Sequence, residues 1–223
     1  MKQLFTIFSL FISIFSFSQK LALDHTVYDQ WESIRETIWQ PQGQFICYTI
    51  NPQEGDAVLI IKNIASKIDI IIPRGAQPIF TEDGNYLIAK IKPSFNETRK
   101  AKIDKKKPDE MPKDSLVIVT IANGNITKIP SVKSFQVPEF GNGLIAYLKE
   151  TKGDFNKEGA PLYFRDLNSG QERVFNNISQ YLIHPKGEGV MMYQVRSKLK
   201  EAKILLSSIA DTNTITLNSH FYT

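Results

Sequence analysis

Three histidines are the residues of this chain that could serve as a general base in serine-type hydrolysis. They are His25, His184 and His220 in a sequence of 223 residues. His25 lies in the N-terminal segment, His184 precedes Pro185 in a predicted turn, and His220 lies close to the last residue. A serine nucleophile of the hydrolase type sits in a G-x-S-x-G elbow, and the sequence contains no such motif. We therefore expect structural or solvent-exposed histidines and no catalytic residue.

Two pairs of carboxylates could suggest metal binding or acid–base chemistry. They are Glu54 with Asp56, and Asp109 with Glu110. Neither pair has the spacing of a known metal-binding loop, so we predict no metal site and no bound cofactor. Asn96, Asn125 and Asn177 begin N-x-S/T sequons, which matter only in a host that glycosylates them.

A charged run, RKAKIDKKKPDEMPKD at residues 99–114, is the main basic feature. As a site it could bind an anionic polymer or lipid head groups. As a structural feature it would be a solvated loop or a short charged helix, the interpretation that its four acidic residues favour. No aromatic residue lies among the basic ones, and the net charge of the chain is only +4, so we expect no nucleic-acid partner.

The elements that would position these residues come from an internal repeat. Four segments share a turn that ends in glycine and is followed by a short apolar strand. The segments are QPQGQFICYTI (40–50), TEDGNYLIAKI (81–91), PEFGNGLIAYL (138–148) and HPKGEGVMMYQ (184–194). The aligned glycines, Gly43, Gly84, Gly141 and Gly187, are 41, 57 and 46 residues apart.

Each repeat continues with a second strand, a tight turn and a third strand. The second strands are predicted at residues 57–64, 115–122, 161–167 and 203–209. Asn-Gly and Ser-Gly pairs in the turns favour hairpins, because glycine tolerates the positive φ that such turns need. The long spacing contains an insertion at residues 93–114. Without it the period is that of one four-stranded propeller blade.

The fold class that we predict is therefore all-β, a partial β-propeller of about four blades. The fourth strand of each blade would be the segment before the next glycine. A generic all-β sandwich is the alternative, but four units of one internal order argue against it. The predicted organisation is a signal peptide at 1–18, an N-terminal segment at 19–39, and a propeller at 40–223 with blades near 40–80, 81–137, 138–183 and 184–223.

The first 18 residues have the layout of a secretory signal peptide. A positive start is followed by an uncharged apolar run from Leu4 to Phe17, and small residues precede a cleavage site between Ser18 and Gln19. A transmembrane anchor is the alternative, but the run is short for spanning a bilayer. We expect an exported protein, periplasmic or secreted, without a stable membrane anchor.

Two further expectations concern packing. Cys47, the only cysteine, lies on the apolar side of a strand pattern, so we expect a buried core residue rather than a reactive thiol. In residues 23–38, Tyr28, Trp31 and Ile34 recur at three-residue spacing, which predicts a short amphipathic helix or turn packed on the propeller. A ligand site built on these aromatics is the alternative.

Several stretches together resemble the front part of exported prolyl-oligopeptidase-family serine peptidases. They are LDHTVYDQWESI (23–34), YTINPQEGD (48–56) and above all the charged stretch at 92–119. The resemblance implies a β-propeller that restricts substrate access to an α/β-hydrolase domain. This chain departs from the family in lacking the nucleophile elbow, the strand–helix alternation of a hydrolase sheet, and the seven or eight blades typical of the family.

The sequence thus leaves three functional interpretations. In the first, the chain is the non-catalytic propeller portion of such a peptidase. Its partners would then be a hydrolase domain or further blades, in cis or in trans, and peptide substrates. In the second, the chain is an independent exported β-propeller-like binding protein. The third interpretation, which we favour least, is an enzyme with an unrecognised site among its carboxylates.

Overall fold

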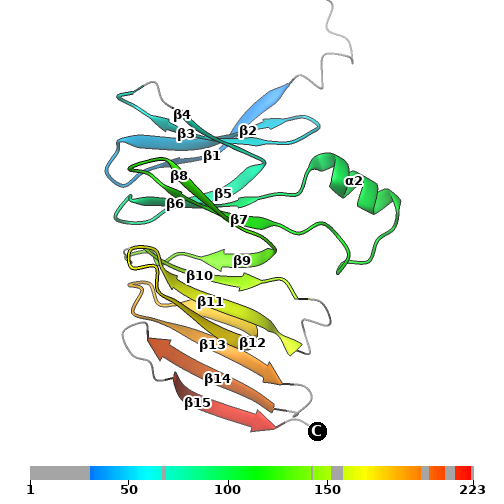
Figure 1. Ribbon diagram of the computed structural model, residues 1–223, viewed down its shortest axis with the longest axis vertical. Coiled ribbons are helices and arrows are strands. Elements are labelled where there is room, and N and C mark those ends of the chain that lie inside the picture. The colour runs from blue at the N-terminus through cyan, green and yellow to red at the C-terminus, as the bar shows by residue number, and fades with distance from the viewer. Residues whose placement is uncertain are drawn as a thin grey trace, which may run out of the picture. The chain divides into compact units, whose positions relative to one another are not determined.

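The chain folds into consecutive antiparallel β-sheets with one described helix, as the computed structural model shows (Figure 1). The structure describes residues 31–66, 69–141, 143–151, 158–196, 201–208 and 214–221, and residues from Glu32 onward form one compact unit. The predicted signal peptide, its Ser18–Gln19 cleavage site and His25 lie outside the described residues.

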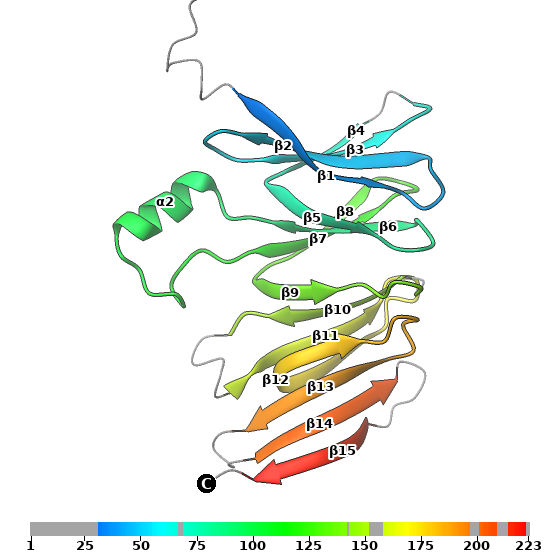
Figure 2. The ribbon, with the colours of Figure 1, turned by 180° about the vertical axis from the view of Figure 1, so that it is seen from behind.

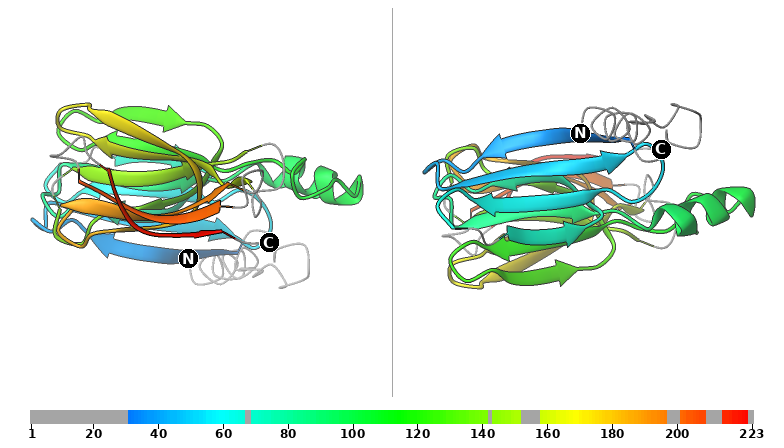
Figure 3. Two further views of the ribbon diagram at one scale, coloured as in Figure 1. Left: turned by 90° about the horizontal axis from the view of Figure 1, so that it is seen from below. Right: turned by 90° about the horizontal axis from the view of Figure 1, so that it is seen from above.

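The first two sheets each have four strands, and each strand pairs with its neighbour in the sequence. The first sheet comprises β1 (Glu32–Trp39), β2 (Phe45–Pro52), β3 (Val58–Asn63) and β4 (Asp69–Pro73). The second comprises β5 (Gly75–Phe80), β6 (Tyr86–Ile91), β7 (Ser115–Thr120) and β8 (Asn125–Ile129). Helix α2 (Phe95–Ile103) lies in the predicted insertion, between β6 and β7, and projects beyond the strand ends (Figure 3).

The remaining strands form a seven-stranded sheet that consists of two blades sharing one strand (Figure 2). The strands are β9 (Val132–Gln136), β10 (Leu144–Lys149), β11 (Ala160–Asp166), β12 (Glu172–Ile183), β13 (Gly189–Arg196), β14 (Glu201–Ser208) and β15 (Thr214–Phe221). The first half of β12 pairs with β11 and its second half with β13. Asn177, with φ 62°, lies at the change of partner, so β12 ends the third blade and begins the fourth.

The same corner recurs between the earlier blades. Arg74 (φ 62°) joins β4 to β5, and Ser131 (φ 58°) joins β8 to β9. A residue in the left-handed region turns the chain from the last strand of one blade to the first strand of the next. Three equivalent corners confirm the repeat that the glycine pattern predicted, and the fold is a partial β-propeller of about four blades.

Two expectations about the elements were wrong. The strand before each glycine pairs with the strand after it, so each sheet begins one strand earlier than the predicted blades 40–80 and 81–137. Residues 32–38, part of the predicted helix, belong to β1. A β-bulge between Arg35 and Ile38 adds a residue, with Glu36 at φ 51°, and breaks the alternation that would have revealed a strand.

Apolar layers between neighbouring sheets hold the blades together. Cys47, Leu59 and Ile61 of the first sheet pack against Leu87 and Val119 of the second. A second layer joins the second sheet to β9 and β10, and a third joins β10 and β11 to β13 and β14. Each sheet thus buries residues of both faces wherever it has a neighbour on both sides.

Candidate functional site

One cross-strand row of side chains in each blade faces the following blade, and we call it the forward row. Its three members are directly paired residues on the first three strands. The rows are Ile38–Cys47–Ile61, Ile79–Ile88–Ile118, Gln136–Ala146–Phe164 and Leu182–Met191–Leu206.

The first three forward rows are covered by the next sheet, and the fourth is not. The members on the second and third strands are at most 5% exposed in the first three blades. In the fourth blade Met191 is 42% and Leu206 39% exposed, and Leu182 is 58% exposed. Ile215 on β15 pairs with Leu206 and extends this row with a side chain that is 58% exposed. The fourth blade therefore presents an apolar row of the same design with no sheet of the described chain over it.

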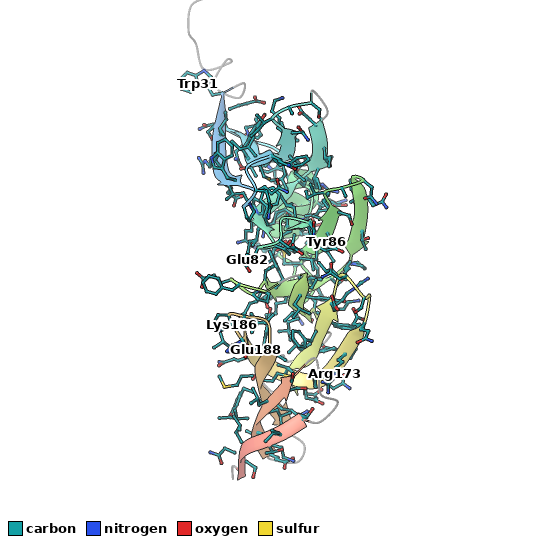
Figure 4. The ribbon with its side chains drawn as sticks, turned by 90° about the vertical axis from the view of Figure 1, so that its left-hand side faces the viewer. Trp31, Glu82, Tyr86, Arg173, Lys186 and Glu188 are labelled. Carbon is teal, nitrogen blue, oxygen red and sulfur yellow. The ribbon has the colours of Figure 1, made fainter. Side chains whose placement is uncertain are left out.

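The fourth row also lines a cavity of about 380 Å³. Leu182, Met191, Leu206 and Ile215 form its apolar wall, and His184, Pro185 and Glu188 lie along its edge. Ser207 is buried in the wall, and its Oγ has no hydrogen-bond partner among the described residues. Figure 4 shows Lys186 and Glu188 on the turn that joins β12 to β13. We call this face, from Leu182 to Ile215, the open face.

Of the three histidines, His184 has a described side chain, and it lies in the predicted turn. Its Nδ1 accepts a hydrogen bond from the backbone N–H of Lys186 at 3.3 Å and lies 3.6 Å from Glu188 Oε2. Within the described ranges, no serine hydroxyl is hydrogen-bonded to this imidazole. The side chain of His220, like all of His25, falls in the part of the chain that is not described.

Cys47 is a core residue, as predicted. It is fully buried, and its thiol is free. Burial, together with the negative charge of Glu36, raises the pKa of the thiol to about 12. The thiol is therefore protonated at physiological pH, which is unlike a reactive cysteine.

The two carboxylate pairs of the sequence analysis lie beside or within the insertion, where three of the four carboxylates accept hydrogen bonds from it. Glu54 Oε1 accepts a hydrogen bond from Arg99 of α2 at 2.6 Å, and Asp56 Oδ1 accepts one from the backbone N–H of Phe95 at 2.7 Å. Both bonds fix α2 to the loop between β2 and β3. Asp109 is exposed, and Glu110 accepts a bond from the N–H of Lys107 at 3.4 Å. No three potential ligands gather into a metal site in the described part of the chain.

The insertion begins with a helix whose start is encoded locally. Ser94 Oγ caps α2 by accepting a hydrogen bond from the N–H of Glu97, and the Glu97 carboxylate accepts one from the N–H of Ser94, which completes a capping box. At the end of the insertion, Asp114 Oδ2 lies 3.2 Å from Lys90 Nζ and 2.8 Å from Lys92 Nζ. Two cavities, of about 500 and 450 Å³, lie where α2 meets the corner at Arg74.

The three sequons lie on separate elements. Asn96 is exposed on α2, and Asn125 is exposed at the start of β8. Asn177 is half-buried at the corner within β12, where its Nδ2 donates to Glu158 O at 2.9 Å. This bond engages the atom that glycosylation would modify.

Sequence reasoning missed the open face, and it also missed Arg74, the corner residue that lines both cavities beside α2. The aligned repeats contain the signal for the open face, because Leu182 and Met191 stand five residues before and four after Gly187, as Ile79 and Ile88 do around Gly84. In the third blade the forward-row residue of the second strand comes five residues after the glycine instead of four. It is Ala146 rather than Ile145, because the turn there is one residue longer.

Among known proteins, it is solved structures that share this fold. No family model matches the chain, and no curated protein matches it. One solved structure is the β-propeller domain of the Trilobed protease from Pyrococcus furiosus, which is described as having an open velcro topology. The match covers 84% of this chain and 58% of that chain, with a TM-score of 0.51 and 12% identity. A structure from a study of two prolyl endopeptidases matches 86% of this chain and 30% of its own, with a TM-score of 0.50 and 12% identity.

A eukaryotic initiation factor has the same fold over 86% of this chain and 44% of its own, with a TM-score of 0.51 and 16% identity. At such identities the likeness establishes the fold alone. The chain spans between 30% and 58% of the length of these three structures. Of the helices in the described ranges, none has the length and apolar character that crossing a membrane requires.

Proposed function

We propose that this chain is the non-catalytic β-propeller portion of a prolyl-oligopeptidase-type serine peptidase. In this role it scaffolds a hydrolase domain and restricts the access of peptide substrates to it. The observation that carries the proposal is the open face, which repeats the design of three covered forward rows. Its occupant is a further antiparallel sheet with an apolar face, because that is what covers the equivalent row in each preceding blade. The remaining blades and the hydrolase domain are thus the partners, in cis or in trans.

The location that we propose is outside the cytoplasm, periplasmic or secreted. The support is the amino-terminal sequence, with its positive start, its apolar run and small residues before Gln19. A peptidase of this kind would meet short peptides there.

An activity assay tests the non-catalytic role. The purified chain is incubated with proline-containing chromogenic peptides, with and without a serine-reactive inhibitor. We expect no hydrolysis above background. Hydrolysis that the inhibitor abolishes would refute the proposal. An antibody against residues 99–114 then reports the native size in the source cells, where a band several-fold larger than 25.4 kDa is expected for partners in cis.

The second candidate is an independent exported binding protein that acts through its loops. The same fold occurs in the initiation factor, whose description names no peptidase, so the fold by itself is compatible with this candidate. An independent protein should melt cooperatively and elute as a monomer. An isolated propeller portion with an uncovered apolar sheet face should associate or melt in stages. Size-exclusion chromatography and thermal melting of the same sample distinguish the two.

A further inference from the structure

The larger cavity at the base of the insertion is strongly basic. It has a volume of about 500 Å³ and lies between α2, the end of β6, the start of β7 and the corner at Arg74. Five cationic residues and a single acidic residue, Glu97, line it. The five are Arg74, Lys92, Lys100, Lys106 and Lys113. We call it the basic cavity.

Two of these cations already have partners. Lys92 Nζ lies 2.8 Å from Asp114 Oδ2, and Lys113 Nζ lies 3.8 Å from Glu150 Oε2. Arg74, Lys100 and Lys106 have no carboxylate partner in the part of the chain that the structure describes. Lys100 and Lys106 are exposed, but Arg74 is half-buried. A partly buried guanidinium without a partner is unfavourable, and a bound anion would offset that cost.

The fold fixes the backbone of Arg74, which lines both cavities. Its backbone N–H donates to Ala57 O at 2.7 Å, and its carbonyl accepts from the N–H of Lys92 at 2.9 Å. The residue thus lies on a corner held by both neighbouring sheets. It also borders the second cavity, of about 450 Å³, whose charged residues are balanced, with Arg74 and Lys92 against Asp56 and Asp114. The excess of positive charge therefore lies in the basic cavity and not in the second one.

We propose that the basic cavity binds an oxyanion, the carboxylate or phosphate group of a small ligand, with Arg74 as its central contact. The planar guanidinium offers two parallel N–H donors to such a group, and Lys100 and Lys106 add positive potential around it. This site does not depend on the proposed function, since it lies on the insertion and not on the open face.

Calorimetric titration of the full chain tests the site with defined probes. The probes are inorganic phosphate, acetyl-diglycine with a free carboxylate, and its C-terminal amide, all in buffer of physiological ionic strength, which screens nonspecific attraction. We expect one of the two anions to bind and the amide not to bind. Binding of phosphate alone or of the carboxylate alone identifies the source of the group.

Three variants connect binding to the cavity. Arg74→Asn removes the guanidinium but suits the positive φ of this corner, and should weaken binding about tenfold or more. Replacing Lys100 and Lys106 together with Gln should weaken it about threefold. Lys128→Gln, an exposed lysine on β8 away from the cavity, should leave it unchanged. Absence of binding by both anions, or binding that Arg74→Asn does not weaken in a protein of unchanged circular dichroism, would overturn the proposal.

Discussion

Cys47 and Met191 occupy the same place in two repeats of one pattern, four residues after a turn glycine. Cys47 is fully buried, whereas Met191 is 42% exposed. Ile88, at this place in the second blade, is also fully buried. The difference lies in the neighbour and not in the residue, because a following sheet covers Cys47 and Ile88 but no described sheet covers Met191. At the scale of single residues, the effect of a substitution should therefore depend on which blade carries it.

A charge placed at equivalent positions tests this dependence. Ile88→Asp would bury an unpaired carboxylate and should lower the free energy of unfolding by about 4 kcal/mol or more, enough to unfold the chain. Met191→Asp places the same group on the open face, and in the isolated chain it should change stability by less than about 0.5 kcal/mol. Urea titrations of both variants measure the difference. Equal destabilisation would mean that Met191 is covered in the isolated chain.

The thiol of Cys47 gives a prediction about pH. Its pKa is raised from 9.0 to about 12 in the folded chain, so the unfolded state releases this proton first as pH rises. The contribution to stability is complete below pH 9 and is lost between pH 9 and 12. Between pH 8 and 10 the wild type should lose about 1.4 kcal/mol more stability than Cys47→Ala, because tyrosines with raised pKa values titrate in both proteins. Urea midpoints of both proteins at the two pH values measure it, and an equal pH dependence would contradict the assignment.

At the scale of elements, corners and turns fix the blades. Gly159 has φ 62° and lies opposite the corner in β12, where an added Cβ would clash with the backbone carbonyl of Asn177. Gly170, in the turn between β11 and β12, has φ 75° with nothing within 4 Å of such a Cβ. The two glycines thus need the same backbone freedom, but only Gly159 also needs the space.

Alanine substitutions at these two positions distinguish the cost of a positive φ from the cost of a steric clash. Gly170→Ala should cost about 1 kcal/mol, the strain of an alanine in the left-handed region. Gly159→Ala adds a clash with the backbone of β12 and should cost about 3 kcal/mol in total. Thermal or urea unfolding of the two variants gives the comparison. Similar losses at both sites would show that the close approach at Asn177 relaxes without cost.

Helix α2 should respond to the loss of its cap locally. Ser94→Ala removes the acceptor for the N–H of Glu97 and should destabilise the helix by about 1 kcal/mol. The helix is attached mainly through Asp56 and Glu54 and contributes Ala101 to the buried residues. We expect faster trypsin cleavage within residues 99–113 and an unchanged urea midpoint. A fall in the global midpoint with no change in cleavage would contradict this.

The elements that the sequence pattern predicted well are those with a strong local signal. The strands after each glycine, their hairpin partners, the insertion and the buried Cys47 all have such a signal in turn glycines and apolar runs. Strand β1 was missed because the bulge at Glu36 hides its alternation and because Ile34, 68% exposed, stands at helix spacing from Trp31. The basic cavity was missed because Arg74 comes from a corner that only the folded sheets bring to α2.

At the scale of the whole unit, two sheet faces have no sheet of the described chain beside them. The open face of the fourth blade is one, and the outer face of the first sheet, with Trp39 at 62% and Ile71 at 57% exposure, is the other. A closed propeller covers both faces with neighbouring blades. The account therefore requires that the native protein supply a sheet to the open face.

Thiol labelling of Met191→Cys in the native protein tests this requirement most directly. Because Cys47 is buried and protonated, labelling of the purified chain reports on the new cysteine. In the native protein, the wild type labelled in parallel gives the background from any other thiol. Lys128→Cys, on an exposed position of β8, is the control. We predict that Met191→Cys reacts freely in the purified chain when it is diluted to a monomer, that it is protected in the protein produced from its own gene in the source cells, and that the control reacts in both. Equal, free labelling of Met191→Cys in both preparations would contradict the account, because no further sheet would then cover the open face.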